Sequence, residues 1–263
     1  MDTIFISHGG GPLPVLGDPS HAQLTARLKA IAGALPTPKA ILVISAHWEE
    51  QVTTITSGAQ PPLIYDYHGF PEESYHLRYP APGAPALAQA IYERLTQAGR
   101  RARLDPARGF DHGVFVPLML MYPNATIPVV QLSLTRDLDP LAHLEVGEAL
   151  RGLKSEGLLV IGSGFSFHNM RAFFQPHTAE IQLQNEGFEG WLHEVCASPT
   201  QRYESRKDHL AQWTSAPYAR FCHPREEHLL PLHVCVGLTQ RPASEAYQVE
   251  VLNKRSSCFV WRG

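Results

Sequence analysis

Three histidines follow apolar stretches that predict buried strands, and this shared position makes them the strongest candidates for chemistry. Histidine is the commonest metal ligand and the usual acid or base near neutral pH. The strands of a parallel sheet place their carboxyl ends along one edge, so three such histidines would meet there. The pairs are Thr3 to Ile6 with His8, Ile41 to Ile44 with His47, and Leu158 to Ile161 with His168. The sequence therefore predicts a metal site at that edge, although one such histidine alone is more often a hydrogen-bonded structural residue.

Two further stretches carry residues of the same chemistry. His112 lies between an aspartate and a glycine at the start of an element, which favours a site residue over a core residue. Glu227 and His228 are adjacent in a turn that is expected to enter a helix, with the acidic residues in its first turn. Neighbouring helical residues point about 100° apart, so only one of the two can easily face a metal. His233 follows in an apolar run and is expected to be packed.

The segment from Pro61 to Pro82 is dense in proline, tyrosine and histidine. Long segments with little regular structure often form binding loops or lids in compact domains. We expect this segment to wall a pocket for an aromatic ligand, with Tyr67 and His76 in contact with it. The alternative is a packed surface loop with ordinary aromatic anchors.

Composition limits the classes of partner. Charged residues make up 18% of the chain and the formal net charge is -3, which offers no basic field for nucleic acid. No apolar run reaches the ~18 residues that a membrane span needs, and no signal-like segment opens the chain. The four cysteines are widely spaced without a CxxC pair, which indicates reduced, packed thiols. We expect a cytoplasmic protein that acts on a small molecule.

Hydrophobic periodicity predicts one α/β domain over residues 1–263, because no linker, repeat or low-complexity tract interrupts the chain. The expected architecture is an α/β/α sandwich with a mainly parallel central sheet and a C-terminal hairpin. The remaining strands are expected at Val52 to Thr56, Arg101 to Leu104, Pro128 to Leu132, Gln248 to Leu252 and Cys258 to Trp261. Helices are expected at His21 to Ala34, Ala84 to Ala98, Pro140 to Lys154, Thr178 to Cys196 and Gln201 to Trp213.

Short motifs of one known family recur in order along nearly the whole chain. They are Ser-His-Gly at 7–9, Ser-Ala-His-Trp at 45–48, Tyr-Pro-Ala-Pro-Gly at 79–83, Asp-His-Gly at 111–113, the stretch 162–169, and His-Pro at 223–224 with Glu-His at 227–228. In this order and spacing the chain resembles the class III extradiol ring-cleavage dioxygenases of the LigB type, and within them the DOPA dioxygenase branch.

The resemblance implies an Fe(II) site that binds both hydroxyls of a catechol and uses O₂ to open the ring. His8 and His47 match the family's two histidine ligands. The third ligand of the DOPA-type pattern falls on His228, with Glu227 as the second choice. His168 matches the catalytic acid/base, and His112 matches a histidine that contacts substrate and dioxygen. Imidazole ligands also suit Zn(II), which a purified sample could carry.

Two other functions use the same residues. A zinc-dependent hydrolase would activate water with these histidines. A non-catalytic binding protein on the same scaffold would need no acid/base pair, so the presence of both His168 and His112 argues against it. The expected partners are therefore a small catechol and O₂.

Overall fold

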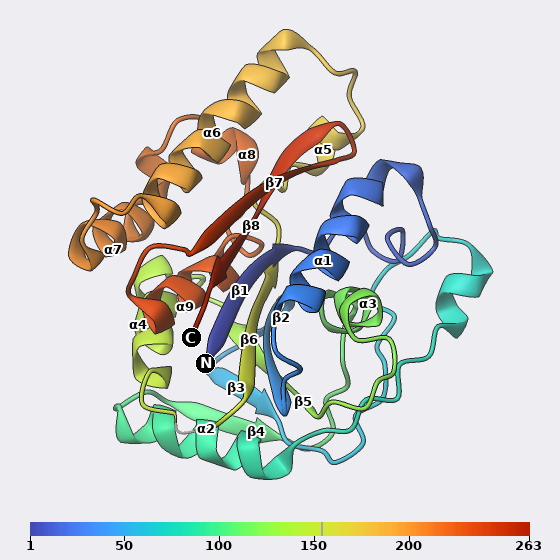
Figure 1. Ribbon diagram of the computed structural model, residues 1–263, viewed down its shortest axis with the longest axis vertical. Coiled ribbons are helices and arrows are strands. Elements are labelled where there is room, and N and C mark those ends of the chain that lie inside the picture. Colours follow the sequence, from blue (N-terminus) through green and yellow to red (C-terminus); the bar gives the residue numbers. More distant parts are fainter. Residues whose placement is uncertain (154) are drawn as a thin grey trace.

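The chain folds around one sheet that has helices on both of its faces (Figure 1). The computed structural model describes residues 1–153 and 155–263. Its strands are β1 (Asp2–Ser7), β2 (Ala40–Glu50), β3 (Thr53–Thr56), β4 (Ala102–Asp105), β5 (Val129–Thr135), β6 (Leu158–Gly164), β7 (Glu245–Val251) and β8 (Lys254–Trp261). Its short 3-10 helices are η1 (Pro19–His21), η2 (Glu72–His76) and η3 (Trp213–Ser215).

The α-helices cover the sheet and differ widely in length. They are α1 (Ala22–Ala34), α2 (Pro85–Gln97), α3 (His112–Met121), α4 (Pro140–Leu150), α5 (Met170–Phe173), α6 (Ala179–Ala197), α7 (Tyr203–Ala211), α8 (Ala219–Cys222) and α9 (Leu230–Thr239). Within the described ranges, none of them combines the length and the apolar character that a membrane span requires.

The strands lie in the order β4-β3-β5-β2-β6-β1-β8-β7, so β2, β6 and β1 are neighbours. β6 is parallel to both β1 and β2, and β2 is parallel to β5. β3 runs antiparallel to β5, and β8 runs antiparallel to β1. The carboxyl ends of β1, β2 and β6 therefore meet at one edge, as the three apolar runs predicted, and the mainly parallel sheet is confirmed.

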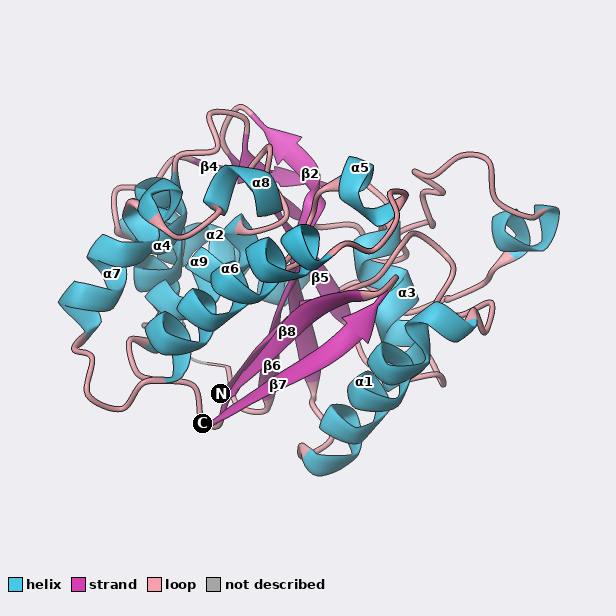
Figure 2. Ribbon diagram, turned by 90° about the horizontal axis from the view of Figure 1, so that it is seen from above, coloured by secondary structure: helices cyan, strands magenta, loops and turns pink. Residues whose placement is uncertain are grey.

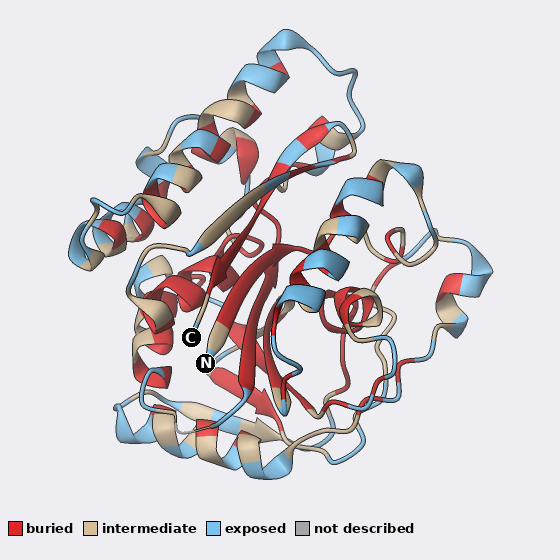
Figure 3. Cartoon of the chain, in the orientation of Figure 1, coloured by how far each residue is buried: buried red, intermediate tan, exposed pale blue. Residues whose placement is uncertain are grey.

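Alternate residues of the central strands face opposite helix layers, which explains why these strands are apolar throughout. In β1, Ile4 and Ile6 pack with α1 and α3, whereas Phe5 packs with α6 and α9. Figure 2 shows the sheet between the two helix layers, and Figure 3 shows that buried residues concentrate along it. The predicted α/β/α sandwich is confirmed.

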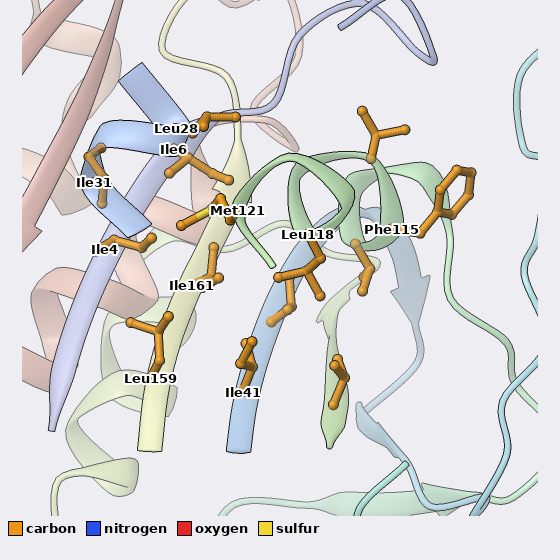
Figure 4. Packing of buried hydrophobic residues seen from close by; sticks show 14 of the residues in the cluster. Ile4, Ile6, Leu28, Ile31, Ile41, Phe115, Leu118, Met121, Leu159 and Ile161 are labelled. Carbon is orange, nitrogen blue, oxygen red and sulfur yellow. The ribbon is translucent and has the colours of Figure 1, made fainter. Parts of the chain in front are cut away.

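The layer formed by α1 and α3 positions one side of the later site. Figure 4 shows Leu28 and Ile31 of α1 and Leu118 of α3 lying over the sheet, with Ile161 of β6 beneath them. A fully buried Leu or Ile side chain contributes about 1.5–3 kcal/mol. This packing holds α3 against the sheet, and His112 is the first residue of that helix.

The predicted C-terminal hairpin is confirmed as β7 and β8. Leu252 and Asn253 connect the two strands with φ of 52° and 60°. Two-residue hairpin turns with positive φ match the twist of the flanking strands. The hairpin extends the sheet next to β1, whose last residue precedes His8.

Two predicted boundaries near the candidate histidines are wrong. β2 does not end at Ile44, because it continues to Glu50 after a register shift against β5. His47 therefore lies within an irregular part of the strand. The acidic pair at 226–227 lies in a turn before α9 and not in its first turn, since α9 begins at Leu230 with a proline as its second residue.

The predicted helix from Pro140 to Lys154 is shorter in the structure. α4 ends at Leu150, and Leu153 donates its backbone N–H to the carbonyl of Leu150 in the turn that follows. Lys154 lies outside the described residues.

A buried carboxyl group lies behind the carboxyl ends of β1 and β6. Glu189 of α6 has no exposed surface and accepts hydrogen bonds from the hydroxyls of Ser166 and Ser257. Burial raises the pKa of Glu189 to about 7, although both hydroxyls favour the anion. The folded state therefore favours the protonated carboxyl.

Relative to wild type, Glu189→Gln is expected to have a higher free energy of unfolding at high pH than at low pH, because glutamine cannot lose a proton there. The folded pKa of about 7 exceeds the ordinary value of 4.5, so the stability contributed by protonation is complete below pH ~4.5 and is lost as the pH rises through about 7. At ~1.4 kcal/mol per pKa unit the loss is on the order of 3 kcal/mol. Urea unfolding at pH 5 and pH 8 measures it, with Glu194→Gln on the exposed face of α6 as the control. The prediction is contradicted if the free energies of unfolding of variant and wild type differ by the same amount at pH 5 and at pH 8.

Candidate metal centre and active site

His8, His47 and His228 turn the same ring atom towards one point. Nε2 of His47 lies 3.1 Å from Nε2 of His8 and 3.3 Å from Nε2 of His228. His8 follows β1, His47 lies in the irregular part of β2, and His228 lies in the turn before α9. The fold thus brings together two rings that are 181 residues apart in the sequence.

The Nδ1 atoms of two of these rings have acceptors on the far side. Nδ1 of His8 lies 3.0 Å from Oγ of Ser163, whose own hydrogen is donated to the carbonyl of Gly113. Nδ1 of His228 lies 2.9 Å from Oε1 of Glu227. The Ser163 hydroxyl already donates its hydrogen elsewhere, and the Glu227 carboxylate has none, so both groups can only accept from the rings. Both imidazoles therefore carry their proton on Nδ1. Their Nε2 atoms therefore present lone pairs to the point of convergence.

The three rings are neutral. Burial, and after it repulsion from neighbouring imidazoles, lowers the pKa of His8, His47 and His228 well below the ordinary histidine value. The neutral ring is the form that binds metals. Nitrogen lone pairs at these separations repel one another unless a cation lies between them. Nitrogen ligands that each lie ~2.0–2.1 Å from one metal ion are roughly 3 Å apart, which matches the separations of these Nε2 atoms. The donor set fits a divalent metal ion.

His112 lies against the same cluster. Its ring centroid is 3.9 Å from that of His47, and the ligand atoms of His8, His47 and His112 lie within 4.8 Å of one another. Oδ1 of Asp66 accepts hydrogen bonds from the backbone N–H of His112 at 2.9 Å and from its Nδ1 at 2.9 Å. Nδ1 of His112 therefore carries a proton, as Nδ1 of His8 and of His228 does.

Asp66 also faces His47, because its Oδ2 lies 3.7 Å from Nδ1 of that ring. Burial acts to raise the pKa of Asp66, but its hydrogen bonds with His112, followed by its interaction with His47, outweigh burial and hold the pKa at about 2. The carboxylate is thus an anion that orients both rings. Asp66 is not among the residues predicted from the sequence, although its place next to Tyr67 in the Pro61 to Pro82 segment is a signal that points to it.

His168 stacks on His228, with ring centroids 3.4 Å apart and an interplanar angle of 16°. Nδ1 of His168 lies 3.2 Å from Oε1 of Glu227, the same oxygen that faces Nδ1 of His228. Burial acts to raise the pKa of Glu227, but the hydrogen bond with His168 outweighs it and the pKa is lowered. Glu227 therefore contacts the outer sides of both rings, and this geometry favours His228 over Glu227 as a metal ligand.

Close approach of the backbone requires glycine at two positions around these rings. A Cβ on Gly164, at the end of β6, would lie 2.1 Å from the carbonyl oxygen of His228. A Cβ on Gly113 would lie 2.5 Å from Oγ of Ser45 and 3.0 Å from Cδ2 of His47. Neither position has room for a side chain, so glycine allows β6 and α3 to reach the cluster.

Of the two substrate contacts predicted in the Pro61 to Pro82 segment, one lies at the histidine cluster and the other lies away from it. Tyr67 is buried, its ring centroid is 5.7 Å from that of His112, and its hydroxyl donates to the carbonyl of Ser74. The side chain of His76 is 72% exposed and contacts Glu72. It lies in η2, on the teal segment that projects at the right of Figure 1. The structure brings Tyr67 to the cluster but does not bring His76 there.

The fold and the site together define a candidate metal centre, in which three Nε2 atoms converge and two further histidines lie against the same rings. Comparison with known proteins identifies the family. The model of the catalytic LigB subunit of aromatic ring-opening dioxygenase matches residues 3–258. The chain belongs to this family, whose members use a non-haem metal centre.

Relatives of known name agree with this assignment. The chain is 38% identical to the dioxygenase tasH of Hapsidospora irregularis, over 99% of this chain and 85% of that protein. It is 40% identical to 4,5-DOPA dioxygenase extradiol of Portulaca grandiflora, over 90% of this chain and 85% of that protein. The crystal structure of an uncharacterized protein from Escherichia coli K12 matches with a TM-score of 0.77 and 29% identity, covering both chains completely. The predicted class, an extradiol ring-cleaving dioxygenase, is confirmed.

Proposed function

We propose that the chain opens the ring of a DOPA-like catechol at an iron(II) ion held by His8, His47 and His228. The observation that carries the ligand assignment is the convergence of three Nε2 atoms at 3.1 and 3.3 Å, with the protons of His8 and His228 on the opposite ring atom. The names of relatives from Portulaca grandiflora and Beta vulgaris, both 4,5-DOPA dioxygenase extradiol, support the substrate class.

Bound iron(II) supplies the adjacent open positions at which a catechol and dioxygen can bind, as in non-haem iron oxygenases with few protein ligands. His8, His47 and His228, from separate elements, would hold the ion. Zinc suits the same imidazoles, so metal content and activity need to be measured on the same sample.

His168 and His112 serve the substrate's protons in this proposal. Each has a carboxylate at Nδ1, Glu227 for His168 and Asp66 for His112. A carboxylate at Nδ1 fixes the tautomer and orients the ring, which leaves Nε2 able to accept a proton. His168 takes a proton from a catechol hydroxyl and returns it to the ring-opened product. His112 contacts the substrate and dioxygen from the other side of the cluster.

Rings of the Pro61 to Pro82 segment form the wall beside His112. Tyr67 packs against Tyr75, Phe70 and Phe115 as well as His112. Aromatic faces of this kind suit a flat catechol ring. Because the hydroxyl of Tyr67 is bonded to the backbone of the same segment, we assign Tyr67 a shape-determining role and not a polar contact.

Iron(II)-loaded protein is expected to consume one O₂ per catechol and to form a yellow ring-opened product. The panel consists of DOPA, dihydroxyphenylacetate and protocatechuate, followed with an oxygen electrode and by absorbance. Protein loaded with zinc is the control and should consume no oxygen. Absence of oxygen uptake with every catechol, together with hydrolysis of ester or amide substrates by the zinc form, would replace the proposal with a zinc hydrolase.

A further inference from the structure

His47 lies in a part of β2 that regular strand pairing does not hold. The pairing of β2 with β5 breaks off after Ile44 and resumes at Glu49. On the other side of β2, the pairing with β6 ends at Ser45. Irregular strand segments of this kind re-aim a side chain. The direction of the His47 ring therefore depends on contacts other than the regular ladders.

The hydroxyl of Ser45 provides such a contact. Its Oγ accepts the backbone N–H of His47 at 3.2 Å and donates its own hydrogen to Oδ1 of Asp111 at 2.7 Å. Neither Ser45 nor Asp111 has any exposed surface. Because Asp111 takes the hydrogen of the hydroxyl, the lone pairs of Ser45 stay available to the N–H of His47.

The second oxygen of Asp111 is held from other elements. Oδ2 accepts a hydrogen bond from Nε2 of Gln131 in β5, and it lies 3.3 Å from a terminal nitrogen of Arg108. The Arg108 guanidinium also lies over the ring of Trp48, 5.1 Å from its centre. A buried polar group is stable only when it is hydrogen-bonded, and both oxygens of this carboxyl group have donors. Asp111 is thus fixed independently of the segment of β2 that it supports.

Asp111 also stands at the start of α3. Its backbone carbonyl accepts the N–H groups of Val114 and Phe115 in the first turn of that helix, and His112 is the helix's first residue. The side chain of Asp111 faces β2, while its main chain opens α3. One residue therefore sets the position of the strand that carries His47 relative to the helix that carries His112.

We propose that Asp111 is a positioning residue for the metal centre and that it acts through Ser45 on His47. The inference rests on the proposed assignment of His47 as a metal ligand, and it deepens that assignment. Asp111 holds the ligand in place before a metal ion binds and takes no part in ring opening. Metal affinity therefore depends on a hydroxyl and a carboxyl group that are not themselves ligands.

The first test measures the dissociation constant for zinc(II) by competition with a chelator, on metal-free protein that circular dichroism shows to be folded. Ser45→Ala is expected to bind zinc ~10- to 100-fold more weakly, the range for groups that support a ligand. Tyr203→Phe is the matched control, because it removes a hydroxyl that donates to the carboxylate of Glu148 at 2.6 Å. That bond joins α7 to α4, at the left of Figure 1, and its loss should leave zinc binding unchanged. An unchanged constant in Ser45→Ala, or an equal loss in Tyr203→Phe, would overturn the inference.

Asp111→Asn tests the carboxyl group without opening a cavity. An amide has one acceptor oxygen, so it cannot serve Ser45 on one side and Gln131 with Arg108 on the other. Zinc binding should weaken, but by no more than in Ser45→Ala. The double variant should bind zinc no more weakly than Ser45→Ala, because both changes act on the same bond. An unchanged constant in Asp111→Asn, a larger loss than in Ser45→Ala, or losses that add in the double variant would remove Asp111 from the positioning of His47.

His47→Ala in the same measurement separates this inference from the proposed function. Loss of zinc in His47→Ala with full affinity in Ser45→Ala leaves the ligand assignment in place and overturns the positioning role. Full affinity in His47→Ala overturns both. If both variants lose affinity as expected and the iron-loaded wild type opens no catechol, the positioning role stands and the ring-cleavage proposal fails.

Discussion

His47→Ala is expected to lose most of its bound metal and all measurable ring cleavage. Nε2 of His47 lies 3.1 Å from that of His8 and 3.3 Å from that of His228, so its removal takes away a ligand that adjoins both of the others. Loss of a group that merely supports a ligand lowers metal affinity ~10- to 100-fold, and loss of the ligand itself should exceed that range. Metal per protein after anaerobic iron loading and desalting measures the effect. His209→Ala, on the exposed surface of α7, is the control.

The third ligand is tested with the same measurement. His228→Ala should lose metal as His47→Ala does, whereas Glu227→Gln should retain most of it, because Glu227 faces Nδ1 atoms on the outer side of the rings. Loss of metal in Glu227→Gln with full occupancy in His228→Ala would make the glutamate the ligand. Loss in His112→Ala with full occupancy in His228→Ala would place the ion among His8, His47 and His112, whose ligand atoms are also close together.

The part of the site that follows from strand order could be predicted from the sequence. Buried parallel strands have a recognisable apolar pattern, and the rule that their carboxyl ends share an edge brings His8 and His47 together without knowledge of the rest of the fold. His168 lies several residues after the end of β6, yet it still reaches the cluster, where its ring stacks on His228. The local sequence had already singled out His112 and the pair Glu227 and His228 as candidates. The resemblance to a known family added their expected roles and the choice of His228 as the third ligand.

Asp66 and Ser163, the acceptors behind two of the rings, could not be predicted in the same way. Asp66 reaches His112 across 46 residues, from a segment with almost no regular structure. Ser163 meets His8 across 155 residues through the pairing of β1 with β6. Such contacts depend on side-chain direction and on loop path, neither of which has a sequence period. The irregular part of β2 shows the same limit, because a register shift near His47 changes which way its ring points.

His168→Gln is expected to keep its metal and to bind a catechol, while kcat falls ~10²- to 10⁴-fold, the range that general acid–base groups contribute. Glutamine preserves much of the side-chain volume but cannot accept and return a proton at the required position. Metal content, anaerobic catechol binding and single-turnover kinetics of the iron-loaded variant measure the three properties separately. Exposed His209 again provides the matched control, as His209→Gln.

The contacts of His168 allow a structural role to be distinguished from a role in proton transfer. Its ring stacks on His228 and shares Oε1 of Glu227 with that ring, so a structural role would disturb metal binding through His228. Loss of metal together with activity would therefore make His168 a fourth ligand or a support of His228, and an unchanged kcat would remove it from the reaction. A proton-transfer role requires that metal and catechol binding persist and that added imidazole restores part of kcat in His168→Ala. An exogenous imidazole can replace a missing proton carrier, but it cannot reorient His228.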